Sequence, residues 1–274
     1  MYDIYDIDLL VDPFDKLTVM STDEENTPEI AQEEQALEPE ASQGSSTSNS
    51  NNNNKKRNGR HGARNQHRHK NLCKWIMETF DLQKGDLVVD VAGGKGELAA
   101  RLTICHQLRV LLVDPRPADV PKTFETLVLP KLPKRHQERW QERCADNPDF
   151  MSQVFTERFD QVQIYFDDST LASNEKLKEA MQSAKVIIGM HADGATEYIV
   201  DAALQYGKPF VVVPCCVFPN LFNQRFLFRH EKKIPVRSHE QFCAFLLEKD
   251  ARFRREVLPF EGRNVAIIWN GVTG

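Results

Sequence analysis

The chain of 274 residues lacks the features that mark membrane, secreted and zinc-knuckle proteins. Its six cysteines form no C-x-x-C pair, and the adjacent Cys215 and Cys216 suit neither a disulfide framework nor a zinc knuckle. No stretch approaches the roughly 18 uninterrupted apolar residues of a membrane span. The N-terminus is acidic and has no basic region of a secretory signal. We therefore expect a protein of a reducing compartment, cytoplasmic or nuclear, with no membrane attachment and no bound metal.

The net charge of −5 conceals two segments of opposite charge. Residues 1–54 carry 13 acids and one base and are rich in Glu, Ser, Asn and Gln, so they cannot bury enough apolar surface to offset their ordering entropy. We expect a disordered tail there. Residues 55–70 carry seven Lys or Arg and no acid. This basic linker, from Lys55 to Lys70, predicts a phosphate-binding arm. A nuclear localisation signal and a merely solvated linker are the alternatives. The folded domain is expected over 71–274.

Within 71–274, short apolar runs alternate with segments of helical periodicity. The apolar runs predict strands at 87–91, 109–113, 162–166, 185–190, 209–213 and 265–269. The periodic segments predict helices at 70–80, 97–106, 173–184, 194–206 and 239–250, with a helical insertion at 134–145. Strands separated by helices require right-handed crossovers. The sequence therefore predicts an α/β fold, a Rossmann-like, mostly parallel sheet flanked by helices.

A glycine-rich turn, D-V-A-G-G-K-G, spans residues 90–96 directly after the first expected strand. Glycines there make the tight strand-to-helix turn and let the backbone approach a ligand closely. Asp114 closes the next strand 18 residues after Gly96, where an acid is placed to bind ribose hydroxyls. The predicted cofactor-binding residues are Asp90, Ala92, Gly93, Gly94, Gly96 and Asp114.

Two common nucleotide-binding patterns are absent from this turn. The P-loop pattern G-x-x-x-x-G-K-[ST] is missing because Gly96 and Glu97 follow Lys95. The dinucleotide pattern G-x-G-x-x-G is missing because Ala99 stands where the third glycine would be. A glycine turn without a ligand and a nucleotide-dependent oxidoreductase stay open as alternatives, and the missing third glycine argues against the second.

Polar residues and thiols follow the fourth and fifth expected strands. His191 can take a proton near neutral pH, and Asp193 can orient it or the substrate. The alternative is that Asp193 caps the following helix while His191 packs. Cys215 and Cys216 either line a substrate pocket or are small buried residues. Because ligands in open α/β sheets bind at the carboxyl ends of the strands, we expect these residues beside the glycine turn.

Aromatic and basic side chains interleave beyond the fifth strand. Phe222 and Arg225 stand among them, and such residues can stack on unpaired bases. Packing in the core or in a lid is the alternative.

The turn at 90–96, with an acid closing the strand, resembles motif I of the Rossmann-like S-adenosylmethionine-dependent methyltransferases. H-x-x-G-A-T at 191–196 and the C-C doublet at 215–216 resemble the branch that contains the tRNA acceptor-stem ribose methyltransferases and related methyltransferase-like proteins. The resemblance covers roughly residues 71–274. It implies S-adenosylmethionine as cofactor, with Asp90 near its methionine end and Asp114 on its ribose. It also implies His191 or Asp193 as the residue that accepts a proton or holds the nucleophile.

The expected function is thus methyl transfer from S-adenosylmethionine, with RNA, tRNA-like, as acceptor. Asp193 stands where the tRNA enzymes have Cys, and Val217 where they have His. These differences keep two alternatives open: a non-catalytic interaction or cofactor-binding protein with a methyltransferase fold, and a protein methyltransferase.

Overall fold

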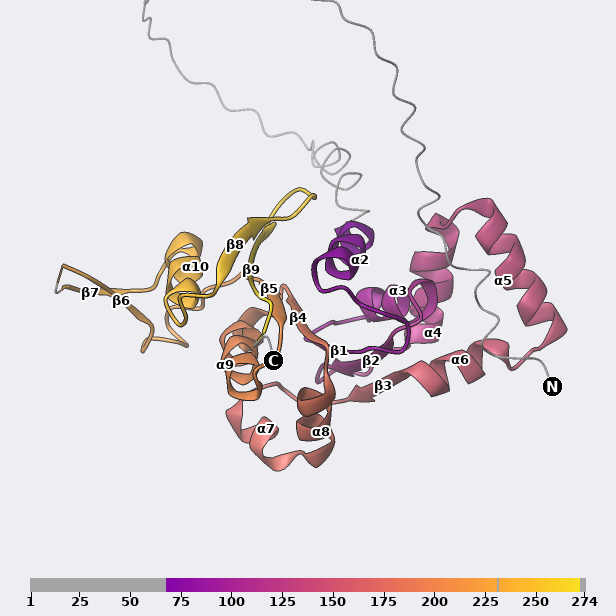
Figure 1. Ribbon diagram of the computed structural model, residues 1–274, viewed down its shortest axis with the longest axis horizontal. Coiled ribbons are helices and arrows are strands. Elements are labelled where there is room, and N and C mark those ends of the chain that lie inside the picture. The colour runs from indigo at the N-terminus through magenta and orange to yellow at the C-terminus, as the bar shows by residue number, and fades with distance from the viewer. Residues whose placement is uncertain (1–67, 231, 272–274) are drawn as a thin grey trace, which may run out of the picture.

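The computed structural model describes residues 68–230 and 232–271 (Figure 1). The acidic tail predicted at 1–54 and residues 55–67 of the basic linker lie outside the described residues. The first described helix begins at Arg68, so the last basic residues of the linker, Arg68 and Lys70, belong to this helix.

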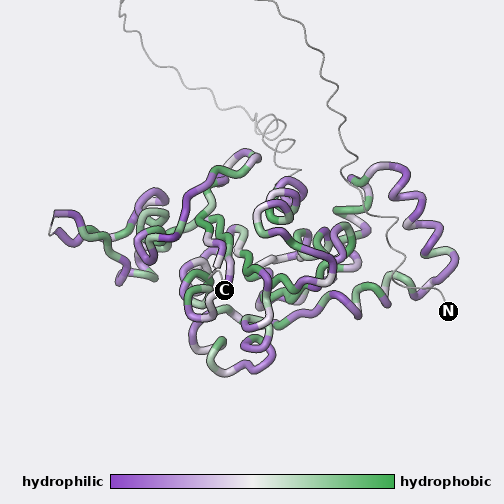
Figure 2. Tube along the Cα trace, in the orientation of Figure 1, coloured by the Kyte–Doolittle hydropathy of each residue, from purple (hydrophilic) through white to green (hydrophobic). Residues whose placement is uncertain are grey.

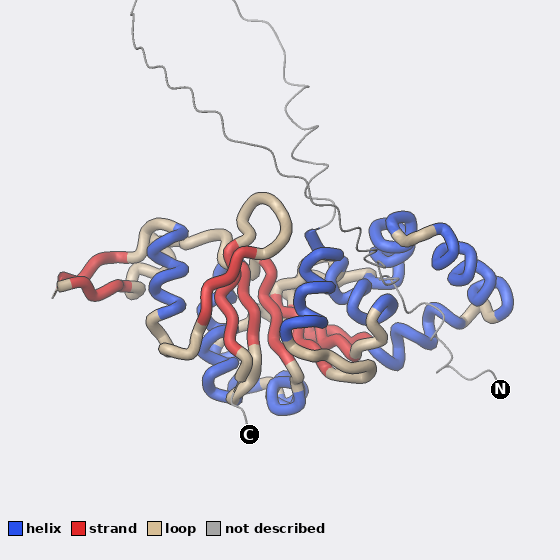
Figure 3. The backbone as a smooth tube through the Cα atoms, turned by 45° about the horizontal axis from the view of Figure 1, so that its top comes forward, coloured by secondary structure: helices blue, strands red, loops and turns tan. Residues whose placement is uncertain are grey.

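A seven-stranded sheet forms the middle of the fold, in the order β3-β2-β1-β4-β5-β9-β8. Its strands are β1 (Leu87–Val91), β2 (Arg109–Val113), β3 (Phe159–Val162), β4 (Val186–Met190), β5 (Phe210–Val213), β8 (Arg254–Val257) and β9 (Val265–Trp269). Neighbours among β1 to β5 pair in parallel, and β9 runs antiparallel to both β5 and β8. This confirms the predicted α/β class and mostly parallel sheet, which Figure 3 shows with its twist.

Helices cover both faces of the sheet. One face carries α2 (Arg68–Thr79), α3 (Glu97–Cys105), α4 (Val120–Thr123), α5 (Lys134–Asp146) and α6 (Phe150–Arg158). The other carries α7 (Asp168–Ser173), α8 (Glu175–Ser183), α9 (Thr196–Tyr206) and α10 (His239–Leu247). Three short turns of helix, η2 (Phe124–Val128), η3 (Leu129–Lys131) and η4 (Asp193–Ala195), join these elements. Among the described residues, no helix combines the length and apolarity needed to cross a bilayer.

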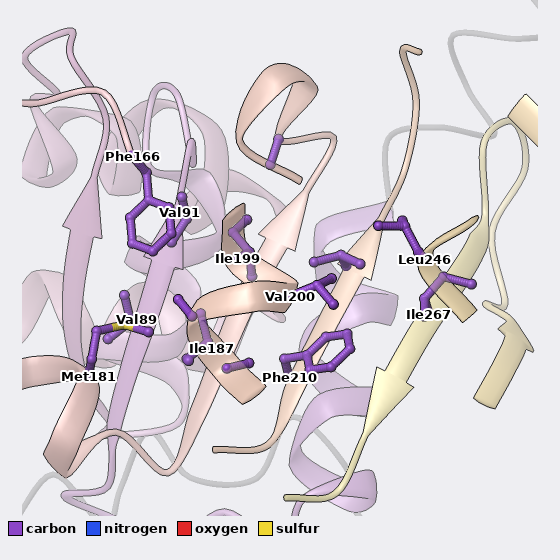
Figure 4. Close-up of a cluster of buried hydrophobic side chains, with 14 of the residues drawn as sticks. Val89, Val91, Phe166, Met181, Ile187, Ile199, Val200, Phe210, Leu246 and Ile267 are labelled. Atoms are coloured by element: carbon purple, nitrogen blue, oxygen red, sulfur yellow. The ribbon is translucent and has the colours of Figure 1, made fainter. Parts of the chain in front are cut away.

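Alternate residues of the central strands point into two separate cores. On β4, Val186 and Ile188 pack with α2 and α3, whereas Ile187 packs with α8 and α9. Figure 4 shows Ile187 beside Ile199 and Val200 of α9. All five residues of β4 are buried, which explains why this strand has a continuous apolar sequence rather than an alternating one. In Figure 2 the apolar colour follows the sheet, while α5 is largely polar.

The predicted insertion at 134–145 is confirmed as α5, within a longer helical excursion between β2 and β3. It has its own core, in which Trp140 is 3% exposed. The Trp140 ring centroid lies 4.6 Å from that of Phe124 and 5.2 Å from that of Phe150. The face of this basic helix that carries Trp140 therefore packs against the rest of the insertion.

The prediction of a strand at 162–166 is wrong, because β3 spans Phe159–Val162. Its pairing with β2 runs from Val110↔Phe159 to Val113↔Val162, and β2 ends there. The alternating apolar residues that follow have no strand to pair with. The amide of Ile164 turns back to the carbonyl of Val162 at 3.1 Å, and Tyr165 is 74% exposed.

The predicted helix at 173–184 is confirmed as α8, which begins after Asn174 because the Asn174 side chain caps it by accepting from Leu177 N–H. The predicted helix at 239–250 corresponds to α10, which opens with a capping box of Ser238 and Gln241. The hairpin β6 (Phe226–Arg229) and β7 (Lys232–Pro235) was not predicted. It projects beyond α10 in Figure 1.

Candidate functional site

The sheet has a topological switch point where β1 lies between β2 and β4. Chain connections leave β1 toward β2 on one side and reach β4 on the other, so a crevice opens outside the carboxyl ends of these strands. The turn at 90–96, Asp114, the loop at 191–193 and the thiols at 215–216 all follow such strand ends. The fold thus brings together sequence segments that are more than a hundred residues apart.

The glycine turn has the left-handed backbone conformation that its composition suggests. Gly94 has φ 60° and Gly96 φ 73°, while Ala92 reaches φ 56° despite its Cβ. Gly93 is required for a different reason, because a Cβ there would lie 2.5 Å from Asp90 Oδ2 and 2.6 Å from Leu112. The carbonyl of Gly93 accepts from Gly96 N–H at 3.0 Å, which closes the turn at the start of α3.

Asp114 is tied directly to this turn. Gly94 N–H donates to Asp114 Oδ2 at 2.9 Å, and the Asp114 side chain is only 1% exposed. Arg116 donates to the same carboxylate through its backbone N–H (3.0 Å), Nε (3.0 Å) and a terminal guanidinium nitrogen (3.1 Å). Burial works against ionisation of Asp114, but these hydrogen bonds outweigh it and hold the pKa below its ordinary value. The acid closing β2 is therefore a fixed carboxylate.

A cavity of about 470 Å³ adjoins the turn and the Arg116 side chain. Gly94 and Arg116 line it, together with Lys95, Lys122 and Thr123. The Arg116 side chain is 74% exposed, so it can leave Asp114 without disturbing the core. The wall therefore combines three cationic side chains with apolar ones such as Pro117 and Leu127, which suits a ligand with both polar and apolar parts.

Asp90 lies inside β1 and is fully buried. Neither of its carboxylate oxygens has a hydrogen-bond partner among the described residues. Burial, and then the like charge of Asp114, raise the pKa of Asp90 to about 7. A buried unpaired carboxyl is costly, and a cationic or donor group entering from the crevice would satisfy it.

The loop after β4 is held by backbone and side-chain contacts to β5. The His191 N–H donates to the carbonyl of Val213 at 3.1 Å, extending the β4–β5 pairing. Cys215 Sγ lies 3.0 Å from Asp193 Oδ1 and donates its thiol proton there. Asp193 does not cap α9, whose N-cap is Ala195 with no side-chain bond. The capping alternative for Asp193 is therefore wrong.

The two thiols are not activated nucleophiles. Burial, and then the hydrogen bond to Asp193, raise the pKa of Cys215 to about 12. The pKa of Cys216 is also raised, chiefly by its hydrogen bond to Asp193. A thiolate is the attacking form, so covalent catalysis by either cysteine would require a different environment.

His191 is half-buried, and its environment favours the neutral imidazole. Burial lowers the pKa of His191 from its ordinary value, and the positive charges of Arg68 and His69 lower it further, while Asp193 opposes them. A neutral ring can accept a proton at physiological pH. The start of α2, which continues the basic linker, thus lies within electrostatic range of the candidate base.

Glu97, which follows the glycine turn directly, is the centre of a charge cluster that sequence reasoning missed. It binds His69 at 3.2 Å, Arg101 at 3.2 Å and Lys131 at 3.6 Å. Although burial opposes ionisation, the hydrogen bond and charge of His69 and the two further cations lower the pKa of Glu97 to about 2. Its position in the first turn of α3 was the available signal, since acids favour helix N-termini.

Phe222 and Arg225 are both buried, at 7% and 2% exposure. Arg225 Nε donates to Glu197 Oε2 at 2.5 Å, and its guanidinium carbon lies 3.6 Å from the Phe222 ring centroid. Phe222 in turn faces Gly194, where an added Cβ would lie 3.4 Å away. In this structure the two side chains pack beneath the loops that carry His191 and Cys216, rather than offering a free stacking surface.

No protein-family model matches the chain, and no curated protein matches it. Several solved structures are similar at low identity. The C-terminal domain of a precorrin-6Y methyltransferase from Rhodobacter capsulatus is 13% identical with TM-score 0.36, over 73% of this chain and 87% of that chain. The methyltransferase domain of bacterial CtHen1 is 12% identical with TM-score 0.42, over 75% and 98%. An RNA methyltransferase from Salinibacter ruber, in complex with S-adenosyl-L-homocysteine, is 14% identical with TM-score 0.32, over 62% and 95%. At these values the matches assign no activity to this chain.

Proposed function

We propose that this protein binds S-adenosylmethionine at the switch point and transfers its methyl group to an acceptor. The observation that carries the proposal is the hydrogen bond between Gly94 N–H and Asp114, which joins the turn after β1 to the acid after β2. In dinucleotide sites the third glycine of the fingerprint allows close packing of the helix on the strand, and Ala99 stands at that position here. A sulfonium nucleoside brings a ribose and an amino acid end without phosphates.

The residues of the crevice fit the groups of such a cofactor. Gly94 lines the cavity, and a Cβ there would meet the Arg116 guanidinium at 3.7 Å, so the cofactor would pass close to the Gly94 backbone. Asp114 would accept from ribose hydroxyls, and the buried unpaired oxygens of Asp90 suit the ammonium of the methionine end. When bound, the cofactor supplies an electrophilic methyl on a sulfonium, and the protein contributes chiefly alignment of the nucleophile in a dry pocket. His191 would hold or accept the acceptor's proton.

The acceptor we infer is RNA, tRNA-like, and this inference rests on the edge of the crevice. Arg68 and His69, at the end of the basic linker, lie close enough to His191 to lower its pKa. Tyr165 after β3 is 74% exposed and Phe218 after β5 is 40% exposed. Exposed aromatic rings near cations are suited to unstacked bases and a phosphate backbone.

One observation favours the non-catalytic alternative. Both oxygens of Asp114 are occupied by Arg116 and Gly94, so a ribose has to displace the Arg116 guanidinium. A protein that kept the fold without the cofactor could retain this arginine as a permanent counterion.

Calorimetry of the full chain with S-adenosylmethionine, its demethylated product and NAD tests the proposal. We expect binding of the first two and none of NAD. Asp114→Ala should weaken binding, since each charge-assisted hydrogen bond to a hydroxyl is worth roughly 1.5–3 kcal/mol. Asp250→Ala is the matched control, because Arg252 binds Asp250 through the same backbone N–H, Nε and terminal nitrogen, outside the crevice. Binding of NAD alone, or equal affinity in the Asp114 variant, would overturn the assignment.

A further inference from the structure

Three potential metal ligands meet where β4 and β5 end. One ligand atom each from Asp193, Cys215 and Cys216 lies within 4.8 Å of the other two. Asp193 and Cys215 are 22 residues apart in sequence. Met190 pairs with Val213 at the last register position of the two parallel strands, so the loops that follow must leave the sheet side by side.

The backbone before this cluster is in a conformation that only the surrounding structure can maintain. His191 has φ 57° and Asp193 has φ 48°, in the left-handed region that residues with a Cβ rarely adopt. Asp193 makes no helix cap that would account for this conformation. What the conformation achieves is contact: the Asp193 carboxylate meets the Cys215 thiol at 3.0 Å.

We propose that Asp193, Cys215 and Cys216 bind one thiophilic divalent cation of the Zn²⁺ class. Zinc prefers tetrahedral sets of sulfur, nitrogen and carboxylate oxygen, and a set of three protein ligands leaves one position open. Bond lengths of about 2.3 Å to sulfur and about 2.0 Å to oxygen separate tetrahedral ligands by roughly 3.5–3.8 Å. The ligand atoms already lie within 4.8 Å of one another, and the side chains have room to rotate because Asp193 is exposed and both cysteines are only half-buried.

The proton balance follows from the thiol chemistry. In the metal-free form the Cys215 thiol donates to Asp193. On binding, M²⁺ forms two bonds to sulfur and one to the carboxylate, and two thiol protons are released to solvent. No electron is transferred. The apparent affinity should therefore rise with pH, and the fourth position is available to a water molecule or to a heteroatom of a ligand.

The sequence led us to expect no metal, because no C-x-x-C spacing is present. That expectation considered neighbours along the chain only, whereas these ligands come from two strand ends. The three proposed ligands do not include Asp90, Asp114 or any residue of the glycine turn. It does not depend on the proposed cofactor, and either proposal can fail without the other.

The test uses the full chain, purified with a chelator and titrated with Zn²⁺ or Co²⁺ alone. We expect one equivalent of Zn²⁺ by mass spectrometry of the metal. With Co²⁺ we expect a thiolate-to-cobalt charge-transfer band, and release of two protons for each ion bound. Cys215→Ser, Cys216→Ser and Asp193→Asn should each lose stoichiometric binding. Cys144→Ser, a half-buried free cysteine in α5, should retain it.

Circular dichroism and melting of the metal-free variants separate loss of the site from loss of the fold. Cys215→Ser and Asp193→Asn are close in size to the native residues, so native-like melting is expected. Three outcomes would overturn the proposal. The first is binding of less than one metal ion per chain, and the second is binding that survives all three substitutions. The third is a Cys215–Cys216 disulfide that forms in reducing buffer and blocks the metal.

Discussion

Arg116 covers the carboxylate of Asp114: the arginine side chain is 74% exposed, the aspartate 1%, and three hydrogen bonds of 3.0–3.1 Å join them. The backbone N–H of Arg116 would hold Asp114 in place even after the guanidinium moved away. The pair therefore has a fixed part and a movable part. A ligand with two hydroxyls can replace the movable part without rebuilding the turn.

This relationship predicts the effect of Arg116→Ala. If ribose hydroxyls displace the guanidinium, removing it should tighten cofactor binding, because the competing ion pair no longer has to be broken. Because water and salt screen the exposed Arg116 guanidinium, the gain should be small, at most roughly fivefold in Kd by calorimetry. Arg252→Ala, which removes the same kind of clamp from Asp250, should leave Kd unchanged. Weaker binding in Arg116→Ala would instead mean that the guanidinium contacts the ligand.

The buried carboxyl of Asp90 predicts how stability depends on pH. Its pKa in the folded chain is about 7, above the ordinary value of 3.8, so the folded state holds a proton that the unfolded state has lost. Stability should therefore fall as pH rises from about 4 to about 7, by up to roughly 4 kcal/mol at about 1.4 kcal/mol per pKa unit. Saturating cofactor should reduce this loss if its ammonium pairs with Asp90.

Asp90→Asn isolates that contribution. The amide cannot ionise, so melting temperature in the absence of cofactor should decline less between pH 5 and pH 8 than in the native chain. Asp250→Asn is the control, because hydrogen bonds from Arg252 lower the pKa of Asp250 to about 2, outside this pH range. Parallel melting curves for the native chain and Asp90→Asn would contradict the raised pKa.

If His191 is the general base of the proposed reaction, His191→Ala should lower the catalytic rate without weakening cofactor binding. A positioned general base contributes typically 10²–10⁴-fold, so kcat should fall by about that factor while cofactor Kd stays constant. Because burial lowers the pKa of His191, native activity should persist below pH 6.5, the ordinary histidine value. His230→Ala, an exposed histidine at the end of β6, should have native activity. A native kcat in His191→Ala would show that His191 is not the general base.

Local patterns predicted what is decided locally. The turn at 90–96 was recognised because its glycines and the preceding apolar strand are contiguous, and the predicted β1, β2 and β9 agree with the structure residue for residue. The strand at 162–166 failed because its length depends on where its partner β2 ends. The residues around Val162 do not by themselves indicate where β2 ends.

Contacts between distant segments could not be predicted from spacing. Arg225 reads as a free cation in the sequence, yet Glu197 neutralises it, and the rings of Phe222 and Phe242 lie on it at 3.6 and 4.6 Å. The meeting of Asp193 with Cys215 likewise depends on β4 and β5 being neighbours in parallel. The fold class determines such contacts, but only the register specifies which side chains take part.

The last prediction concerns the basic linker and the RNA acceptor. Arg68 and Lys70 belong to α2, so the cations that precede the helix are Lys55, Lys56, Arg57, Arg60 and Arg64. Replacing these five residues by Gln should flatten the slope of log affinity against log salt for single-stranded RNA by up to roughly 3.5 units, since each phosphate contact contributes about 0.7. A variant with the order of residues 55–67 scrambled keeps the charge and should keep the slope. Filter binding over a salt series measures both. An unchanged slope in the Gln variant would mean that the linker does not contact RNA phosphates. Transfer of labelled methyl only into protein fractions would exclude RNA as the acceptor and leave the cofactor proposal intact.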